Sequence, residues 1–168
     1  ISYWFIRDNA LNNIQLSTSD LNDRDFLTKL TFKDGLVTVG DEEPSSSTIY
    51  YLYGGSDQSD YLGCYGCTNT ATDSVCNSVG TYGSNVSTSS IWNTVGSYGS
   101  TVGTYSPWNS VSTSPPEFFN QDKTTTYGKF TINTVTANRT TVTKLTNIID
   151  YFNNNSSDIA ATREYACE

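Results

Sequence analysis

The sequence predicts a mainly β, α+β protein with an antiparallel sheet, one C-terminal amphipathic helix and a disulfide-bound, loop-rich repeat region. Several short apolar runs are dominated by β-branched and aromatic residues, which favour strands. Residues 73–116 repeat with a period of sixteen. Four cysteines, an even number, predict disulfides. Because a chain of 168 residues is long enough for one core and short for two, we expect a single domain over residues 1–168.

Strand predictions rest on runs of β-branched and aromatic side chains. These runs are residues 1–7, 48–53 and 127–135. Residues 19–30 begin with side chains that cap helices, and predict one short helix. Near the C-terminus apolar residues recur at the spacing of one helix face, at Leu145, Ile148, Ile149 and Phe152. We expect this amphipathic helix to cover an open face of the sheet.

The clearest local prediction is a β-hairpin in residues 29–39. Asp34-Gly35 favours a two-residue hairpin turn, because both residue types tolerate the positive φ that such turns require. The cross-strand pairs that this turn predicts are Phe32 with Val37 and Leu30 with Val39. All four side chains then share one face, so the hairpin has an apolar face and a mostly polar one.

The strand at residues 1–7 has two interpretations. It is either the first strand of the chain's own sheet, the common arrangement, or a donor strand that completes the sheet of a neighbouring subunit. In the second case the strand forms a contact surface between subunits. That surface comprises Ile1, Tyr3, Trp4, Phe5 and Ile6.

The cysteines predict two disulfides and an oxidising compartment. They are Cys64, Cys67, Cys76 and Cys167, and three pairings are open. A bridge from the nearly terminal Cys167 to any of the others would close a long loop and hold the C-terminus. A four-thiolate zinc site is disfavoured because the second C-x-x-C is missing, so we expect no metal site.

Further features of the sequence predict an extracellular or cell-surface protein. The chain contains no methionine, so we expect that something was removed from its N-terminus, and an excised secretion signal is the simplest candidate. A fragment of a longer protein would look the same. It contains no apolar run of membrane-spanning length, so we expect no membrane insertion. Four N-x-Ser/Thr sequons mark candidate glycosylation sites, at Asn85, Asn138, Asn154 and Asn155.

The composition argues against several functions. Without histidine the chain cannot build a Ser-His-Asp or Cys-His nucleophile system, and no spacing singles out a catalytic pair among its 17 acidic residues. We therefore expect no enzymatic activity and no cofactor. A net charge of -8, with the basic residues scattered, disfavours nucleic acid and anionic membranes as partners.

The repeat in residues 73–116 is the least generic feature of the chain. Its copies read DSVCNSVGTYGSNVST, SSIWNTVGSYGSTVGT and a truncated YSPWNSVSTSPP. Gly83 and Gly99 each follow a tyrosine, and we expect positive φ there. Two and a half copies are too few for an independent solenoid, so we expect the copies to pack on the domain or on a neighbour.

The large aromatic residues of the repeat also have two interpretations. As surface residues they would form a sugar-binding platform or an interface between subunits. As buried residues they would supply the core of a segment that is otherwise short of large apolar side chains. The residues concerned are Tyr82, Trp92, Tyr98 and Trp108.

The pattern SxWNxxGxYGS resembles a Ser/Asn/Gly/Tyr-rich repeat found in uncharacterised bacterial proteins of exported or surface type. The resemblance covers residues 61–116. In that pattern an aromatic residue usually precedes the glycine, whereas this chain has Val79 and Val95 there, and Val111 at the aligned position of the third copy. The resemblance implies a surface-associated protein and no particular activity.

These observations lead to two hypotheses of function. The first is a non-enzymatic extracellular structural protein, a subunit of a surface filament or layer assembled through its N-terminal strand. Its partners would be further copies of itself or other surface proteins. The second is a secreted glycan-binding module that uses the aromatic residues of the repeat.

Overall fold

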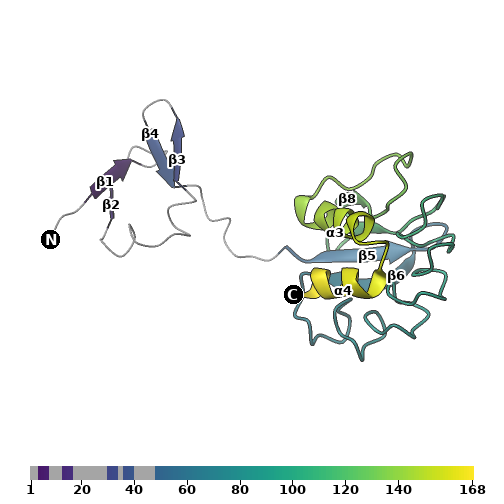
Figure 1. The fold of residues 1–168 in the computed structure, drawn as a ribbon. Coiled ribbons are helices and arrows are strands. Elements are labelled where there is room, and N and C mark those ends of the chain that lie inside the picture. The colour runs from purple at the N-terminus through teal and green to yellow at the C-terminus, as the bar shows by residue number, and fades with distance from the viewer. Residues whose placement is uncertain (1–3, 8–12, 17–29, 34–35, 40–47) are drawn as a thin grey trace. The chain divides into compact units, whose positions relative to one another are not determined.

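The computed structural model describes the backbone at residues 4–7, 13–16, 30–33, 36–39 and 48–168, and side chains from residue 48 onward. The chain divides into two compact units, Ile1–Ser46 and Ser47–Glu168 (Figure 1). The expectation of a single domain over residues 1–168 stays a prediction. The described strands of the first unit hydrogen-bond only with one another, and the buried cluster of the second is built from its own side chains. None of the helices in the described part of the chain has the length and apolar character that crossing a membrane requires.

The first unit contains two antiparallel strand pairs. β1 (Trp4–Arg7) pairs with β2 (Asn13–Leu16), and β3 (Leu30–Lys33) pairs with β4 (Leu36–Val39). In the second pair Phe32 lies opposite Val37 and Leu30 opposite Val39, so the predicted hairpin register is confirmed. The turn at residues 34–35 lies outside the described residues, as does the helix predicted over residues 19–30, apart from the residue that begins β3.

The pairing of β1 bears on the two interpretations of residues 1–7. β1 pairs with β2 of the same chain, which is the ordinary arrangement. Trp4, Phe5 and Ile6 form the first three positions of β1, whereas Ile1 and Tyr3 lie outside the described residues. The donor-strand hypothesis stays a prediction.

The second unit is built on a four-stranded antiparallel sheet with the order β6-β5-β7-β8. Its strands are β5 (Tyr50–Gly54), β6 (Asp60–Tyr65), β7 (Glu117–Phe119) and β8 (Thr126–Lys129). Residues 66–116, between β6 and β7, contain the repeat, which runs as turns beside the sheet (Figure 1). β6 and β7 were not predicted. β7 is three residues long and lies between two prolines and a polar hairpin, so it has no readable periodicity.

β8 is shorter than the strand predicted over residues 127–135. The chain leaves the sheet after Lys129 because its next backbone groups bond elsewhere. The Phe130 N–H donates to the Pro116 carbonyl at 2.8 Å, and the Ile132 N–H donates to the Pro107 carbonyl at 2.9 Å. Residues 130–135 therefore continue the repeat region rather than the sheet.

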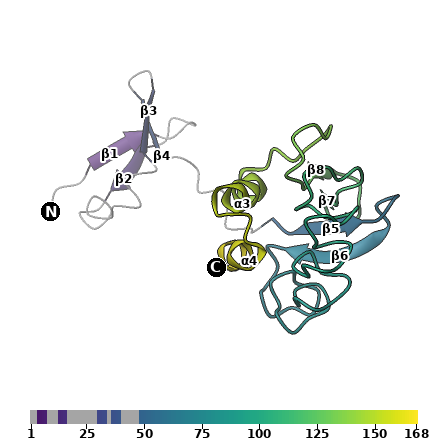
Figure 2. The same ribbon diagram turned by 45° about the vertical axis from the view of Figure 1, so that its right-hand side comes forward.

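The described residues hold two helices, α3 (Thr143–Asn154) and α4 (Ile159–Cys167), which pack against each other (Figure 2). α3 confirms the predicted amphipathic helix, and its buried residues are Leu145, Ile148, Ile149 and Phe152. The second helix corrects the prediction of one. α4 buries only Ile159 and Thr162, so its sequence lacks an apolar stripe, although Asp158 caps it by accepting from the Ala160 and Ala161 N–H groups.

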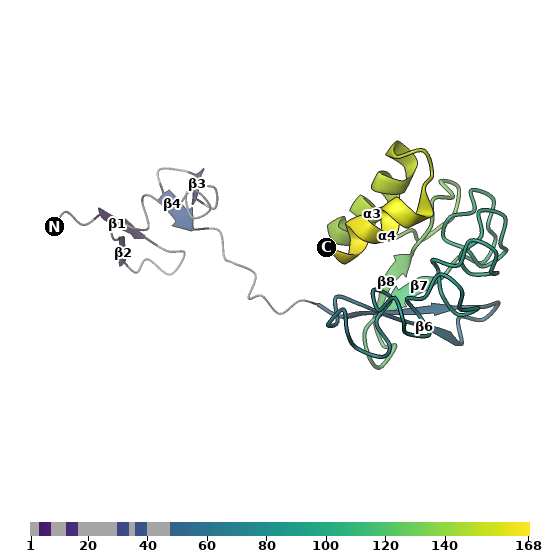
Figure 3. The same cartoon turned by 60° about the horizontal axis from the view of Figure 1, so that its bottom comes forward.

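The core lies between the sheet, the repeat and the helices (Figure 3). Trp108 of the repeat is 1% exposed. Its ring centroid lies 4.9 Å from that of Phe152 in α3, 5.5 Å from that of Phe130 and 5.6 Å from that of Trp92. The repeat is therefore part of the hydrophobic core and not an attachment to it.

All four cysteines form disulfides, as predicted, and the structure selects one of the three pairings. Cys64 bonds to Cys67 at the end of β6. Cys76, in the first copy of the repeat, bonds to Cys167 at the end of α4, across a sequence separation of 91. The second bond ties the repeat to the C-terminus.

Candidate functional site

Each copy of the repeat contains a buried serine whose hydroxyl accepts a hydrogen bond from the backbone two residues later. Ser90 Oγ accepts from the Trp92 N–H, and Ser106 Oγ accepts from the Trp108 N–H, both at 3.1 Å. The equivalent pair in the first copy is Ser74 with Cys76. Such a local bond offers the backbone an alternative to helix and strand hydrogen bonds. It fixes the backbone at Cys76, Trp92 and Trp108 in the same way in each copy.

Each copy also contains an asparagine whose amide bonds the backbone on two sides. The Asn93 Nδ2 donates to the Ser87 carbonyl at 3.0 Å, and its Oδ1 accepts from the Val95 N–H at 3.2 Å. Asn77 and Asn109 make the same two bonds. An apolar residue here would leave backbone groups of the turn without partners, which is costly where they are buried.

The copies are joined to one another by their indole groups. The Trp92 Nε1 donates to the Val75 carbonyl and the Trp108 Nε1 donates to the Ile91 carbonyl, both at 2.6 Å. Each bond reaches back 17 residues, to the position that precedes the matching residue of the previous copy. The two rings stack with an interplanar angle of 27°. Successive copies therefore lie side by side as coils of one short stack.

A fourth asparagine, which the predicted repeat did not include, continues this stack. The Asn133 Oδ1 accepts from the Val135 N–H at 3.1 Å, as in the three copies. Its Nδ2 donates to the Ser112 carbonyl at 3.0 Å and is buried. The tripeptide N-T-V at residues 133–135, which also occurs at residues 93–95, is the signal that could have found it.

The glycines after tyrosine are needed for a different reason from the one predicted. Neither Gly83 nor Gly99 has a positive φ. A Cβ on Gly83 would lie 2.2 Å from the Asn77 carbonyl oxygen, and one on Gly99 would lie 2.4 Å from the Asn93 carbonyl oxygen. The predicted positive φ is therefore wrong, and the requirement is close approach of two backbone segments.

The predicted surface role of the tryptophans is not what the structure contains. Trp92 is 3% exposed and Trp108 is 1% exposed, so neither ring is available to a sugar or to another subunit. Stacking between copies and the indole hydrogen bonds explain their burial. Tyr82 and Tyr98 are half-buried and remain accessible.

Accessible aromatic rings form a strip on the outer face of the sheet. The aromatic strip consists of Phe119, Tyr53, Tyr61 and Tyr82, all half-buried. Neighbouring ring centroids along it are 5.9, 5.2 and 5.0 Å apart. Lys123 lies over one end, with its Nζ 4.1 Å from the Tyr53 centroid. The strip therefore runs from β7 across β5 and β6 to the repeat.

A hollow of about 590 Å³ adjoins the aromatic strip, between β6 and the second copy of the repeat. Its walls include two tyrosines, one carboxylate and three hydroxyl side chains, namely Tyr61, Tyr98, Asp60, Thr88, Ser89 and Ser97. The Tyr98 hydroxyl donates to Asp60 Oδ2, and the Tyr61 hydroxyl donates to Asp73 Oδ2 at 3.0 Å. Of the side chains that the structure describes, only Tyr98 hydrogen-bonds to Asp60, which leaves Oδ1 as an acceptor.

The tyrosine hydroxyls of the hollow stay protonated at physiological pH. Burial raises the pKa of Tyr61, and the hydrogen bond to the Asp73 carboxylate raises it further. The pKa of Tyr98 is raised by burial and by its bond to Asp60. Each hydroxyl donates to its carboxylate and thereby holds the tyrosine ring in a fixed orientation.

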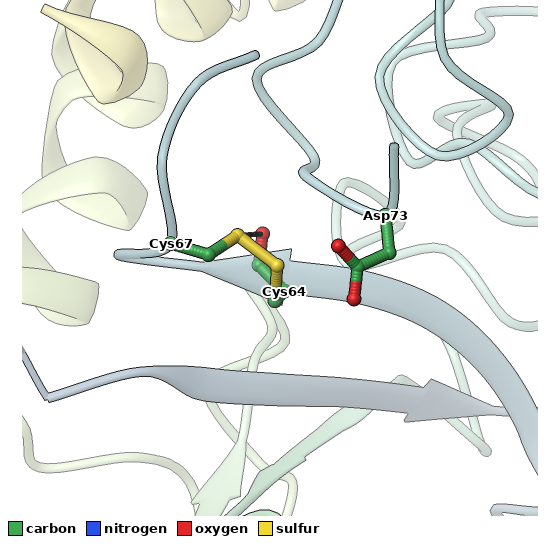
Figure 4. A group of neighbouring side chains, drawn as sticks. All are labelled: Cys64, Cys67 and Asp73. Carbon is green, nitrogen blue, oxygen red and sulfur yellow. Dashed lines mark hydrogen bonds between the residues drawn. A yellow bond between two sulfur atoms is a disulfide. The ribbon is translucent and has the colours of Figure 1, made fainter. Parts of the chain in front are cut away.

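The disulfide at the end of β6 lies beside Asp73 (Figure 4). The two sulfur atoms and a carboxylate oxygen of Asp73 all lie within 4.8 Å of one another, as metal ligands would. Thiolates rather than disulfide sulfurs are the ligands that metal ions take from cysteine. With the Cys64–Cys67 bond formed, this group offers only one carboxylate.

The sequon asparagines all lie on the surface. Asn85, Asn138, Asn154 and Asn155 are exposed, which is the access that attachment of a glycan requires. Glycosylation at these four positions stays a prediction.

Comparison with known proteins identifies no relative. No family model matches the chain, and no curated protein or solved structure matches it either. The arguments about function below therefore rest on the residues and their geometry.

Proposed function

We propose that this protein is a non-enzymatic, exported binding module that holds a neutral glycan in the hollow between β6 and the repeat. One observation carries the proposal. Two tyrosines oriented by carboxylates, a carboxylate with a spare oxygen and three hydroxyl side chains converge on this one hollow.

These groups match the two chemical faces of a sugar. The C–H face of a sugar ring is apolar and packs on an aromatic ring such as that of Tyr61. Its hydroxyls both donate and accept, so they need partners of both kinds. Asp60 Oδ1 accepts, while Thr88, Ser89 and Ser97 offer donors and acceptors.

Charge favours a neutral sugar over an anionic one. Among the residues that the structure describes, no lysine or arginine lines the hollow, whereas Asp60 does. The chain as a whole has a net charge of -8, which repels anionic polymers at long range. A neutral glycan is repelled neither by Asp60 nor by the net charge of the chain.

The aromatic strip supports a ligand longer than one sugar. Tyr61 belongs to both the hollow and the aromatic strip, so an oligosaccharide held in the hollow can extend over Tyr53 or Tyr82. This version of the glycan hypothesis uses sheet residues and excludes the buried tryptophans that the sequence suggested.

The proposed location outside the cell rests on the two disulfides, which persist in oxidising compartments. Assembly through the N-terminal strand is not part of the proposal, because β1 pairs with β2 of its own chain.

The test is calorimetric titration of the full chain with neutral oligosaccharides that a glycan array has selected. We expect Tyr61→Ala to weaken binding at least about tenfold. Tyr61→Phe keeps the ring but loses the hydrogen bond to Asp73, so it should weaken binding less than Tyr61→Ala does. Tyr165→Ala is the matched control, because Tyr165 is an exposed tyrosine of α4 that does not line the hollow.

Two outcomes would contradict the proposal. One is that no neutral glycan binds the wild-type chain. The other is that Tyr61→Ala binds like wild type while its near-ultraviolet circular dichroism shows an intact fold.

A further inference from the structure

The exposed apolar side chains of the described residues are concentrated at the turns of the repeat coils. Eight large apolar side chains are exposed, and six of them are valines that are 74–92% exposed. The six are Val79, Val86, Val95, Val102, Val111 and Val135. Single exposed apolar residues are ordinary, but a set at equivalent positions of a repeat is not.

Local hydrogen bonds hold these valines at the turns. In four cases the valine N–H donates to the Oδ1 of the asparagine two residues earlier, at 3.0–3.2 Å. We name these four valines the valine row, and they are Val79, Val95, Val111 and Val135. An exposed serine or threonine precedes each of them. Val86 and Val102 form a second, shorter row, in which the N–H donates to a serine Oγ.

The valine row is regular because the coils beneath it are stacked. The Trp92 and Trp108 rings, which occupy equivalent places in neighbouring coils, lie 5.6 Å apart. The Ile132 N–H bond to the Pro107 carbonyl adds the last coil. Valines one coil apart therefore occupy equivalent positions, and we expect the row to form a ridge of β-branched side chains with hydroxyl side chains beside it.

Three of the four ridge valines, Val79, Val95 and Val111, lie in the uncharged part of the chain. Residues 74–116 contain no charged side chain, although the chain has nine basic and 17 acidic residues. Two copies that approach through other surfaces meet the repulsion of a net charge of -8. The segment that carries these three valines adds no charge to this repulsion.

We propose that the valine row is the surface through which two copies of this chain associate. A second copy carries ridges with the same spacing, so the valines of two ridges match in register about a two-fold axis. A partner of any other kind would need apolar groups at the same spacing as these valines to match the ridge. Association removes from water four apolar side chains that are now 74–92% exposed.

This inference does not depend on glycan binding. Val95 also lines the hollow, so a second copy would lie at its rim. The test is therefore made without glycan, and its result and that of the glycan titration are independent.

The experiment is sedimentation equilibrium of the full chain from micromolar to near-millimolar concentration. We expect a reversible monomer–dimer equilibrium. The combined variant Val79→Gln, Val95→Gln and Val111→Gln should raise the dimer dissociation constant by more than about tenfold. Val86→Gln with Val102→Gln is the matched control and should leave it unchanged. Glutamine adds no charge and creates no sequon.

Higher ionic strength should strengthen the dimer, because salt screens the repulsion between acidic copies while apolar contact persists. Three results would overturn the proposal. They are a wild-type chain that stays monomeric at every concentration, a row variant that associates like wild type with its tryptophan circular dichroism intact, and a control variant that weakens association as much as the row variant.

Discussion

The sheet and the repeat coils supply hydrogen-bond partners to their backbone groups in different ways. In the sheet, long-range hydrogen bonds run between backbone groups, as between β5 and its neighbours β6 and β7. In the coils, backbone bonds are short-range turns such as Asn93 N–H to the Ser90 carbonyl. The three copies of the repeat are joined to one another by bonds from the Trp92 and Trp108 indoles. A polar segment can therefore fold without strands when its side chains take over the pairing of the backbone.

This difference determines where the sequence can vary. A sheet accepts many side chains on its outer face because its bonds belong to the backbone. The coils depend on particular serines, asparagines, glycines and tryptophans, and leave only exposed turn positions such as Ser78, Thr94 and Ser110 without a bonding role in the described structure. The following predictions test this contrast.

The largest expected effect concerns the two disulfides. Cys76–Cys167 ties the first coil to α4 and closes a separation of 91 residues, whereas Cys64–Cys67 closes one of three at the edge of the sheet. Chain entropy predicts a loss of about 4–5 kcal/mol for Cys76→Ala with Cys167→Ala, and about 2 kcal/mol for Cys64→Ala with Cys67→Ala. Urea unfolding measures the free energy of unfolding of both double variants. Equal losses would contradict the larger contribution predicted for the Cys76–Cys167 bond.

Next is the close approach of backbone at the glycines. A Cβ on Gly99 would lie 2.4 Å from a backbone oxygen of Asn93, whereas one on Gly96 would lie 3.1 Å from the Asn93 side chain, a contact that a small displacement relieves. We expect Gly99→Ala to lower the free energy of unfolding by about 3 kcal/mol and Gly96→Ala by less than about 1 kcal/mol. Thermal and urea unfolding check this order, and a reversed order would contradict the packing of the coils.

A third prediction compares asparagines that each make two hydrogen bonds. Asn93 is 4% exposed in a coil, whereas Asn120 lies in the hairpin between β7 and β8 and is only half-buried. Asn93→Ala should cost about 2–3 kcal/mol, because it leaves buried backbone groups unpaired. Asn120→Ala should cost less than about 1 kcal/mol, since water replaces its bonds. Similar costs in urea unfolding would remove the distinction between the two regions.

The smallest effect, absent at neutral pH, is an alkaline loss of stability that comes mainly from the sheet. Burial raises the pKa of Tyr65 in β6 to about 12, from an ordinary value of 10.0. The folded state thus holds the proton more tightly, so this stabilisation is complete below about pH 10 and is lost as pH rises toward 12. Burial acts in the same direction on the pKa of Tyr61 and Tyr98.

Urea unfolding of the wild type and of Tyr65→Phe between pH 8 and 12 checks this, with tyrosinate absorbance reporting ionisation. Phenylalanine cannot ionise, so the variant should lose less stability over this range. An identical pH dependence in both proteins would assign the alkaline loss to other groups.

Much of the local structure follows from the sequence, because local signals are strong there. The turn at Asp34-Gly35 predicts the register of β3 with β4, and the apolar spacing at residues 145–152 predicts α3 and its buried face. The even number of cysteines predicts two disulfides. By contrast, β7 and α4 carry weak periodicity and form because tertiary packing stabilises them.

The sequence by itself determined that residues 73–116 repeat, that residues 74–116 contain no charged residue and that the chain can form disulfides. Only the tertiary structure decided which cysteines pair, that Trp92 and Trp108 lie inside, and that Tyr61 and Tyr98 face one hollow. The physical reason is that a periodic pattern shows which positions are equivalent but not whether their side chains are buried or face solvent. Burial or exposure of these side chains depends on stacking of the coils and on their contact with α3, which bring together residues far apart in the chain.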